Sequence, residues 1–483
     1  MTKLCGPHGI SPQYAPVFMR RKILPVGRGA FYSEGFRSCP HRRSFPPINV
    51  VYDCGTMTGS QVVQKQAIEA GAREAFGLPS PRSHIHAIFI SHLHKDHING
   101  VPELIAKYDV QRIYFPAITQ LNRAVMKIAF AADDVSGFVA RFCDNPRKAV
   151  DELDVPNAKD IKLIAVGDME GEEGPGGVES HPNGEPIRLF DFGADGKAWQ
   201  NTPFSAWEYV PYNFDMKTFL GNLARKLRPV LLAHLGKDVP LTNAILTSLF
   251  KNKNSRADVI KAYHAASGSS KEGNTNSMVV FSGVHGKSNL VQTLEDCPER
   301  KKQGKRCFPV FPLVYTAPGC LFTGDYNAKE PRQKKLQQSQ NGNPWLGLVA
   351  NYKTYLPFVG AIQIPHHGSA VSFNDKFISC FPKHVFHFMS CGAHDKKHPS
   401  AVVKQAFKMA NKPYCRVTED RNSLLCTIIQ DINAAAQGAI VSGGPRCLFY
   451  AKRCVLAGKQ GEDTSGTQEE SIASSQLPDS LDR

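Results

Sequence analysis

The sequence predicts a mixed α/β fold for a chain of 483 residues. Short apolar runs rich in β-branched residues recur along the chain and end in polar residues, which is typical of buried strands. Stretches with a helical spacing of apolar residues lie between these runs, so that strands and helices alternate. A chain of this length is long enough for one large core or for two domains.

The individual elements follow from these patterns. Strands are predicted around a glycine turn at 18–36 and then at 49–55, 83–90, 274–281, 319–325, 359–365, 385–390, 414–418 and 424–429, and helices at 61–76, 101–108 and 400–409. Between about 121 and 273, helical stretches alternate with Gly- and Pro-rich loops. We predict a largely helical insertion there, within a domain that spans 1–455, and a disordered polar tail at 456–483.

A cluster of histidines follows the strand predicted at Ile88–Ile90. Three of the seventeen histidines fall within six residues, at His92, His94 and His97, together with the carboxylate of Asp96. Imidazole and carboxylate groups together suit Zn, Mn or Fe rather than a thiolate-type site. In a loop that leaves a strand, His92 and His94 can turn to one metal ion while Asp96 and His97 reach a second.

Two later strands end in the same kinds of residue. The first ends in Thr-Gly-Asp325, and the second ends in Pro-His-His-Gly-Ser at 365–369. The pattern His-x-His-x-Asp-His, followed by these two motifs, resembles the metallo-β-lactamase fold superfamily. Within it, the chain is most similar to the hydrolase domain of ComEC, a DNA-uptake protein, in a free-standing form. The resemblance implies a four-layer αβ/βα sandwich with metal ligands in loops at one edge.

The resemblance also assigns roles to these residues. Asp325 bridges two metal ions, because one carboxylate can hold cations about 3.5–4 Å apart. His366 completes the second metal site, whereas His367 supports the ligands or contacts the substrate, and the roles of these two histidines could be exchanged. Asp96 is expected to be both a ligand and a catalytic residue, and His367 is a second catalytic candidate.

Three further residues are candidates for supporting roles. Asp53 ends the strand at 49–55 and is expected to hold the metal loop by hydrogen bonding, although it could be a simple turn residue. Asn276 stands where many relatives place a histidine ligand; asparagine is a poor ligand, so the first metal is expected to be weakly held or absent. His398, in a Lys-His-Pro-Ser motif, either stabilises charge on the leaving group or caps a helix.

The balance of charge favours an anionic partner. The net charge is +15, and nucleic acid is the commonest partner of a basic protein. A basic run is expected either to contact a phosphate backbone or to be a solvated loop; its charged residues are Arg300, Lys301, Lys302, Lys305 and Arg306.

The sequence contains no apolar run near the ~20 residues that a membrane span needs. Its first residues lack the apolar core of a signal peptide. We therefore expect a cytoplasmic protein with no membrane partner, and no protein partner is indicated.

These expectations converge on a metal-dependent hydrolase that uses one or two divalent ions, Zn or Mn, to activate hydroxide. The expected activity is that of a phosphodiesterase or nuclease acting on DNA or RNA. Two alternatives stay open, because a fold does not choose a reaction. One is hydrolysis of a small ester, lactone or amide, and the other is a non-catalytic domain that binds nucleic acid or a protein.

Overall fold

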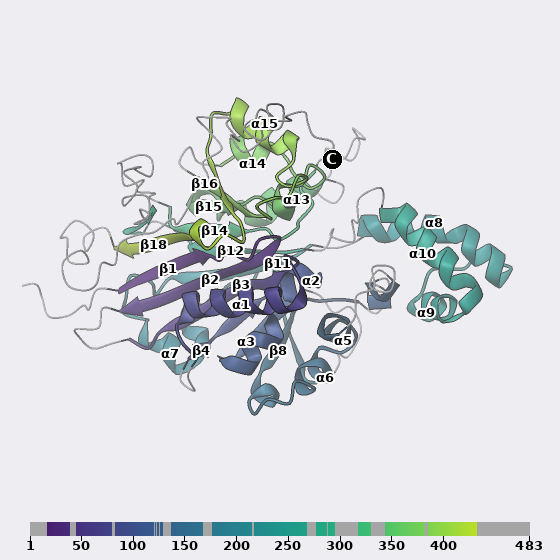
Figure 1. Cartoon of the computed structure of the whole chain (residues 1–483), viewed down its shortest axis with the longest axis horizontal. Helices are drawn as coiled ribbons and strands as arrows, with labels where there is room; N and C mark the ends of the chain where they lie inside the picture. The colour runs from purple at the N-terminus through teal and green to yellow at the C-terminus, as the bar shows by residue number, and fades with distance from the viewer. Residues whose placement is uncertain are drawn as a thin grey trace, which may run out of the picture.

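Two β-sheets stack face to face, and helices cover the outer face of each sheet (Figure 1). The computed structural model describes residues 17–38, 45–79, 83–119, 121, 123–124, 126–128, 137–167, 176–214, 217–267, 277–286, 288–294, 317–329, 343–381 and 385–431. The arrangement is the αβ/βα layering expected from the sequence, so the predicted fold class is confirmed.

The first sheet has nine strands in the order β13-β18-β1-β2-β3-β5-β7-β8-β9. Its strands are β1 (Val17–Ile23), β2 (Gly29–Ser38), β3 (Ile48–Thr56), β5 (Ala87–Phe89), β7 (Arg112–Pro116), β8 (Lys162–Val166), β9 (Val178–His181), β13 (Leu290–Leu294) and β18 (Leu425–Asp431). Every residue of β3 is buried, because this strand lies at the centre of a sheet that is covered on both faces.

The second sheet has seven strands in the order β10-β11-β12-β14-β15-β16-β17. Its strands are β10 (Ile187–Arg188), β11 (Trp207–Asn213), β12 (Met278–Val284), β14 (Gly319–Phe322), β15 (Val359–Gln363), β16 (Phe386–Ser390) and β17 (Tyr414–Val417). Strands β4 (His84–Ile85) and β6 (Asp109–Val110) form a separate two-stranded ladder.

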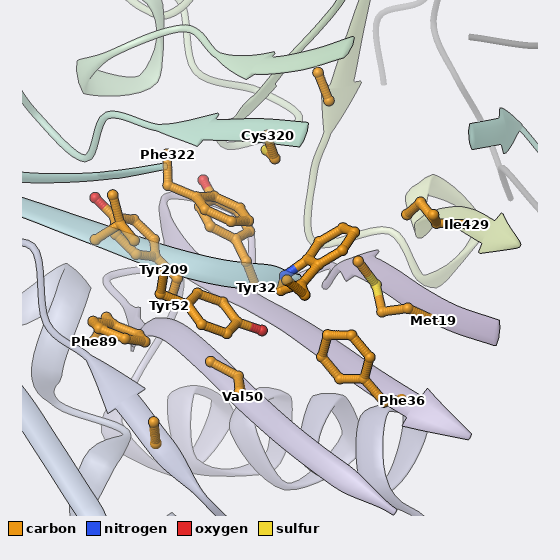
Figure 2. Packing of buried hydrophobic residues seen from close by; sticks show 14 of the residues in the cluster. Met19, Tyr32, Phe36, Val50, Tyr52, Phe89, Tyr209, Cys320, Phe322 and Ile429 are labelled. Carbon is orange, nitrogen blue, oxygen red and sulfur yellow. The ribbon is translucent and has the colours of Figure 1, made fainter. Parts of the chain in front are cut away.

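Large aromatic side chains fill the space between the two sheets (Figure 2). Tyr52 of the first sheet stacks on Phe322 of the second, with ring centroids 4.8 Å apart, and Tyr32 stacks on both rings. All three side chains are nearly inaccessible to solvent. Burial of such rings, together with their stacking, stabilises the contact between the sheets.

Separate apolar clusters attach the helices to the outer faces. Ile68 and Leu104 pack on the first sheet, and Leu348 and Phe407 pack on the second. The helices on the first sheet are α1 (Gln61–Phe76), α2 (Lys95–Ile98), α3 (Val101–Lys107), α5 (Phe138–Asp144) and α6 (Pro146–Asp151), and those on the second are α13 (Pro344–Tyr352), α14 (Lys376–Ser379) and α15 (Ala401–Met409). The short helix α7 (Gly193–Ala198) is flanked by Phe192 and Trp199, which are buried between the two sheets. Helix α1 has the bounds expected from its apolar spacing, with Ser60 as its N-cap.

The predicted insertion at 121–273 is narrower than expected. Strands β8 and β9 from this range join the first sheet, and β11 joins the second. Only α8 (Lys217–Leu235), α9 (Asn243–Lys251) and α10 (Lys253–Ser267) stand apart from the sandwich (Figure 1). These three helices pack on one another through buried leucines, together with part of 121–128. The strands were missed because Gly/Pro-rich loops separate them and each is short.

Strand direction brings chemically important residues to one edge. Strands β14, β15 and β16 are parallel, so their carboxyl ends meet, and β3 and β5 are likewise parallel. The two sheets touch at this edge, because the amide of Met278 donates a hydrogen bond to the carbonyl of Ser91 at 2.7 Å. Among the described residues, no helix combines the length and hydrophobicity that a membrane span requires.

Candidate metal centre

Asp325 lies at the centre of the cluster that forms at this edge. It follows β14, and its carboxylate is almost fully buried. The Nε2 atoms of three histidines face it: His97 lies 3.2 Å from Oδ1, and His92 and His366 lie 3.7 and 3.6 Å from Oδ2. These residues come from the ends of β5, β14 and β15, so three distant stretches of sequence share one carboxylate.

Two groups of side chains have the spacing of metal ligands. One consists of His92, His97 and Asp325, and the other of Asp96, His97 and His367; within each group, one ligand atom from every residue lies within 4.8 Å of the others. The Nε2 atom of His367 is 3.3 Å from Oδ2 of Asp96. The second group therefore contains His367 rather than His366, which is the exchange that the sequence left open.

His94 and His366 lie at the margins of these groups. The ring of His94 is half-buried and stands 4.7 Å from that of His92, measured between centroids. His366 faces Asp325 and also has its Nδ1 2.9 Å from Oγ of Ser372. Both histidines are therefore placed to complete one of the two groups.

Asp53 holds the metal loop through hydrogen bonds. Its Oδ1 accepts the amide of Ser91, and its Oδ2 accepts the hydroxyl of Ser91; both distances are 2.7 Å. Oδ2 also lies 2.7 Å from Nδ1 of His97, which leaves Nε2 of this imidazole directed at Asp325. These are the contacts that the resemblance implied for Asp53.

A β-bulge aims Asp53 at the loop. Its neighbours Tyr52 and Cys54 pair with adjacent residues of β2, so Asp53 itself is the extra residue of the strand. Its φ is +53°, in the left-handed region that non-glycine residues rarely adopt. Bulges of this kind redirect a side chain and are common beside active sites. His366 and His367 also have positive φ values.

Two serines complete the support, and sequence reasoning gave neither of them a role. The hydroxyl of Ser91 lies 2.9 Å from Nδ1 of His92. The hydroxyl of Ser277 lies 3.2 Å from the same nitrogen and accepts the amide of Asp325 at 3.0 Å. Ser277 is fully buried and follows Asn276, in the turn where the resemblance implies a histidine; its hydroxyl contacts His92 and the amide of Asp325. Its only signal in the sequence was its place before a strand.

The backbone at this edge requires a glycine. Gly324, which precedes Asp325, has a φ of +53°, and a Cβ atom at this residue would lie 2.6 Å from that of Ser91. Any side chain there would push the two sheets apart. The Gly of the Thr-Gly-Asp motif thus permits the close approach that brings Asp325 to the histidines.

Burial and mutual charge set the protonation of the cluster. Burial alone would raise the pKa of Asp325 and lower that of His97. The charges of His366 and His97 outweigh burial and hold the pKa of Asp325 well below its usual range. The carboxylates of Asp325 and Asp53 raise the pKa of His97 well above its usual value. By contrast, burial and the charge of His97 lower the pKa of His92, which keeps this imidazole neutral.

His398 lies at the rim of the cluster. Its ring is 6.2 Å from those of His366 and His367, and its Nδ1 is 3.1 Å from Oδ2 of Asp395. The helix-capping alternative is wrong, because Ser400 caps α15 through the amide of Val403. Burial lowers the pKa of His398, and Asp395 opposes this effect.

Some predicted residues lie outside the described part of the chain. These are Asn276, the tail at 456–483 and the basic run of Arg300, Lys301, Lys302, Lys305 and Arg306. Their roles stay predictions.

We expect Asp53→Asn to weaken metal binding about 10–100-fold, the usual effect of losing a carboxylate that orients a ligating imidazole. The asparagine amide keeps the size of the side chain but has no negative charge. It also has one oxygen instead of two, so it cannot make all the hydrogen bonds that Asp53 makes with Ser91 and His97. Zinc affinity is measured by competition with a fluorescent chelator. The control is Asp160→Asn, an exposed position; equal affinities for the two variants would rule out the supporting role.

Comparison with known proteins shows that part of the chain is similar to a protein superfamily. Residues 48–196 match the family model of the metallo-beta-lactamase superfamily. The matched segment contains Asp53 and the His92–His97 loop but ends before Asp325 and the histidines after β15. No curated protein matches the chain.

Proposed function

We propose that the protein hydrolyses phosphodiester bonds in nucleic acid with the help of one or two divalent metal ions. The superfamily match indicates a metal-dependent hydrolase. The observation that carries the proposal is the meeting of the His92–His97 loop, Asp325 and His367 in two groups with metal-ligand spacing.

The residues of the cluster fit a divalent cation. The Nε2 atoms of His92 and His97 are buried and lie 3.7 and 3.2 Å from the carboxylate of Asp325, yet neither makes a hydrogen bond of good geometry in the described part of the chain. Buried nitrogens of this kind normally have a partner. The buried carboxylate of Asp325 and the half-buried carboxylate of Asp96 also need positive charge beside them. Imidazole and carboxylate donors suit Zn or Mn.

We assign His92, His97 and Asp325, with His94 beside them, to one metal ion, and Asp96, His97 or Asp325, and His367 to the other. When bound, such an ion lowers the pKa of a water molecule and offsets negative charge that develops on the substrate. Asn276 and Ser277 stand where the resemblance implies a third histidine for the first group. We therefore expect the first ion to bind more weakly, with between one and two ions per chain.

The choice of a phosphodiester rests on three supports. The motifs around His92–His97, Asp325 and 365–369 resemble the ComEC-like branch. The chain has a net charge of +15, which favours a polyanionic substrate. The rim of the cluster also carries a cation: the exposed Arg28 is close enough to His398 to lower its pKa.

In this proposal, the chain's own residues hold and orient the reacting groups. Asp53 and Ser91 fix His97, and Ser277 fixes both His92 and the backbone of Asp325. His398 donates a hydrogen bond to the leaving oxygen of the substrate, and Asp395 holds the imidazole in place through Nδ1. Preorganised donors of this kind stabilise the charge that develops in the transition state.

We expect His398→Gln to lower kcat about 10²–10³-fold, the range measured when one such donor is removed. Metal content should not change, because His398 belongs to neither ligand group. The loss should be smaller for a p-nitrophenyl diester, whose leaving group needs little assistance. The control is His181→Gln at the end of β9, a histidine that belongs to neither ligand group. A large loss of metal, or an equal loss of kcat with both leaving groups, would contradict this role.

The proposed function is tested with purified protein and Mn, Zn or Mg against single- and double-stranded DNA and RNA. Cleavage that requires metal and weakens as salt rises supports it. Turnover of acyl esters or lactones alone, unaffected by salt, would instead identify a small-molecule hydrolase. Binding of nucleic acid without turnover at saturating metal would identify a non-catalytic domain.

A further inference from the structure

The three helices α8, α9 and α10 form a unit that the metal centre does not use. We call residues 217–267 the helical unit. It lies outside the segment that matches the superfamily and stands away from the stacked sheets (Figure 1). Several of its apolar side chains, among them Leu227, Leu231 and Leu249, are buried against one another and against Ala124 and Ile128.

The helical unit is strongly basic. Its sequence has nine Lys and Arg residues and two acidic residues, Asp238 and Asp258. Both acids already face a basic side chain: Asp238 lies 2.7 Å from Arg228, and Asp258 lies 3.1 Å from His234. The unit thus carries a net charge of +7 in 51 residues, close to half of the excess in the whole chain.

On the surface of the sandwich, helix α1 shows a different pattern, in which basic and acidic side chains are balanced. Helix α1 carries basic and acidic residues in equal number, and they form ion pairs with neighbours, such as Lys107 with both Glu69 and Glu103. On the helical unit, the basic side chains that the structure describes are exposed in all three helices, including Lys226, Lys253 and Lys261. A surface with so much charge of one sign attracts a polyanion.

The helical unit also emerges at the edge that carries the metal centre. It connects the end of β11 to the start of β12, where Asn213 pairs with Met278. Met278 is hydrogen-bonded to Ser91, beside His92, and Ser277 contacts His92 directly. The unit therefore begins four residues after Asn213, and the strand that follows the unit in the chain starts beside the ligand groups.

The dimensions fit a polymer rather than a small molecule. Helix α8 has 19 residues, which corresponds to a length of about 28 Å. A strand of nucleic acid has one phosphate per ~3.4 Å of helix axis, so α8 is as long as about eight nucleotides. A small ester would occupy only the ligand groups and would gain nothing from these charges.

We infer that the helical unit is a nucleic-acid-binding arm that holds the phosphate backbone of a polynucleotide next to the metal centre. This inference rests on the proposed phosphodiester hydrolysis and adds that the substrate is a polymer. An anionic membrane is the less suitable partner, because a helix that lies on a bilayer needs a broad exposed apolar face. In the described part of the unit, Leu232 and Leu235 are the large apolar residues that are exposed.

The test replaces five exposed lysines of the unit with glutamine: Lys226, Lys237, Lys251, Lys253 and Lys261. The matched control replaces five exposed lysines elsewhere: Lys148, Lys159, Lys197, Lys353 and Lys408. Binding of a fluorescent 30-nucleotide DNA or RNA strand is followed by anisotropy in EDTA over a range of salt. Hydrolysis of the same strand and of bis(p-nitrophenyl) phosphate is measured with metal.

The unit variant is expected to bind the strand at least 10-fold more weakly, and the slope of log affinity against log salt should become shallower by about two to four units. Its kcat/KM for the strand should fall by a similar factor, with turnover of the small diester unchanged. In the wild-type protein, kcat/KM should rise with strand length up to about eight nucleotides, and this rise should disappear in the variant.

Other outcomes separate the two proposals. Equal binding and equal salt slopes for the unit variant and the control would overturn the nucleic-acid-binding arm and leave the hydrolase intact. Loss of binding to phosphatidylserine vesicles, with strand binding unchanged, would also overturn it in favour of a membrane contact. If the wild-type protein hydrolyses neither substrate, yet the unit variant alone loses strand binding, the arm stands and the proposed catalytic function fails.

Discussion

Replacing Asp325 with asparagine is expected to reduce turnover of a phosphodiester about 10³-fold or more. Asp325 faces His92, His97 and His366 at once, so the amide removes the negative charge that these three histidines surround. A metal ion supplies several kcal/mol of charge stabilisation to a transition state, and about 4 kcal/mol corresponds to 10³-fold in rate. Metal content, measured by mass spectrometry, should fall together with kcat.

The fold should survive this substitution, because asparagine keeps the shape of the side chain and Ser277 still accepts the backbone amide. The control is Asp160→Asn, which changes an exposed carboxylate to an amide. Circular dichroism of both variants should match that of the wild-type protein. Turnover within about threefold of wild type at full metal occupancy would show that Asp325 does not hold the ions.

The second large effect concerns stability. Arg21 of β1 and Glu34 of β2 form a fully buried ion pair within the first sheet, with Nε and Oε1 2.6 Å apart. Glu34 also accepts hydrogen bonds from Tyr209 and Ser282 of the other sheet. We expect Glu34→Ala to lower the free energy of unfolding by about 3–5 kcal/mol, because it leaves the guanidinium of Arg21 buried without a counter-charge.

Urea unfolding, followed by circular dichroism in EDTA, measures this effect without a contribution from bound metal. The matched control is Glu74→Ala, which breaks the more exposed pair of Glu74 with Lys22 and should cost less than about 1 kcal/mol. Replacing Arg21 and Glu34 together with Met and Leu should recover most of the stability. Equal losses of unfolding free energy for Glu34→Ala and Glu74→Ala would mean that the buried pair stabilises the fold no more than the exposed pair does.

Several elements could be predicted because their signals are local. The apolar spacing of 61–76 sets one face of helix α1, and Ser60 supplies its cap. The β-branched run at 49–55 lies within β3. By contrast, β8 and β9 were hidden in the predicted insertion, since their burial depends on neighbours that are distant in sequence. Local pattern cannot show which short apolar run joins a sheet.

The candidate site likewise has residues that could be predicted from local sequence and others that only the tertiary contacts reveal. The density of histidines at 92–97 and the motifs around Asp325 and 365–369 predicted residues that the structure brings together at one edge. The pairing of His367, rather than His366, with Asp96 depends on a turn with positive φ at both histidines. Ser91 and Ser277 were missed, because serine is common and its role here comes only from where its hydroxyl points.

The sequence by itself determined the mixed α/β class, the side chains able to bind metal and the strands that carry them. Apolar periodicity and donor chemistry belong to the residues themselves and need no knowledge of contacts. The tertiary structure decided which imidazoles face Asp325 and how the bulge at Asp53 directs its carboxylate toward His97. It also decided that the basic helical unit follows a strand that ends at the same edge. Each of these depends on strand direction and on atoms hundreds of residues apart, which come together only when the two sheets pack.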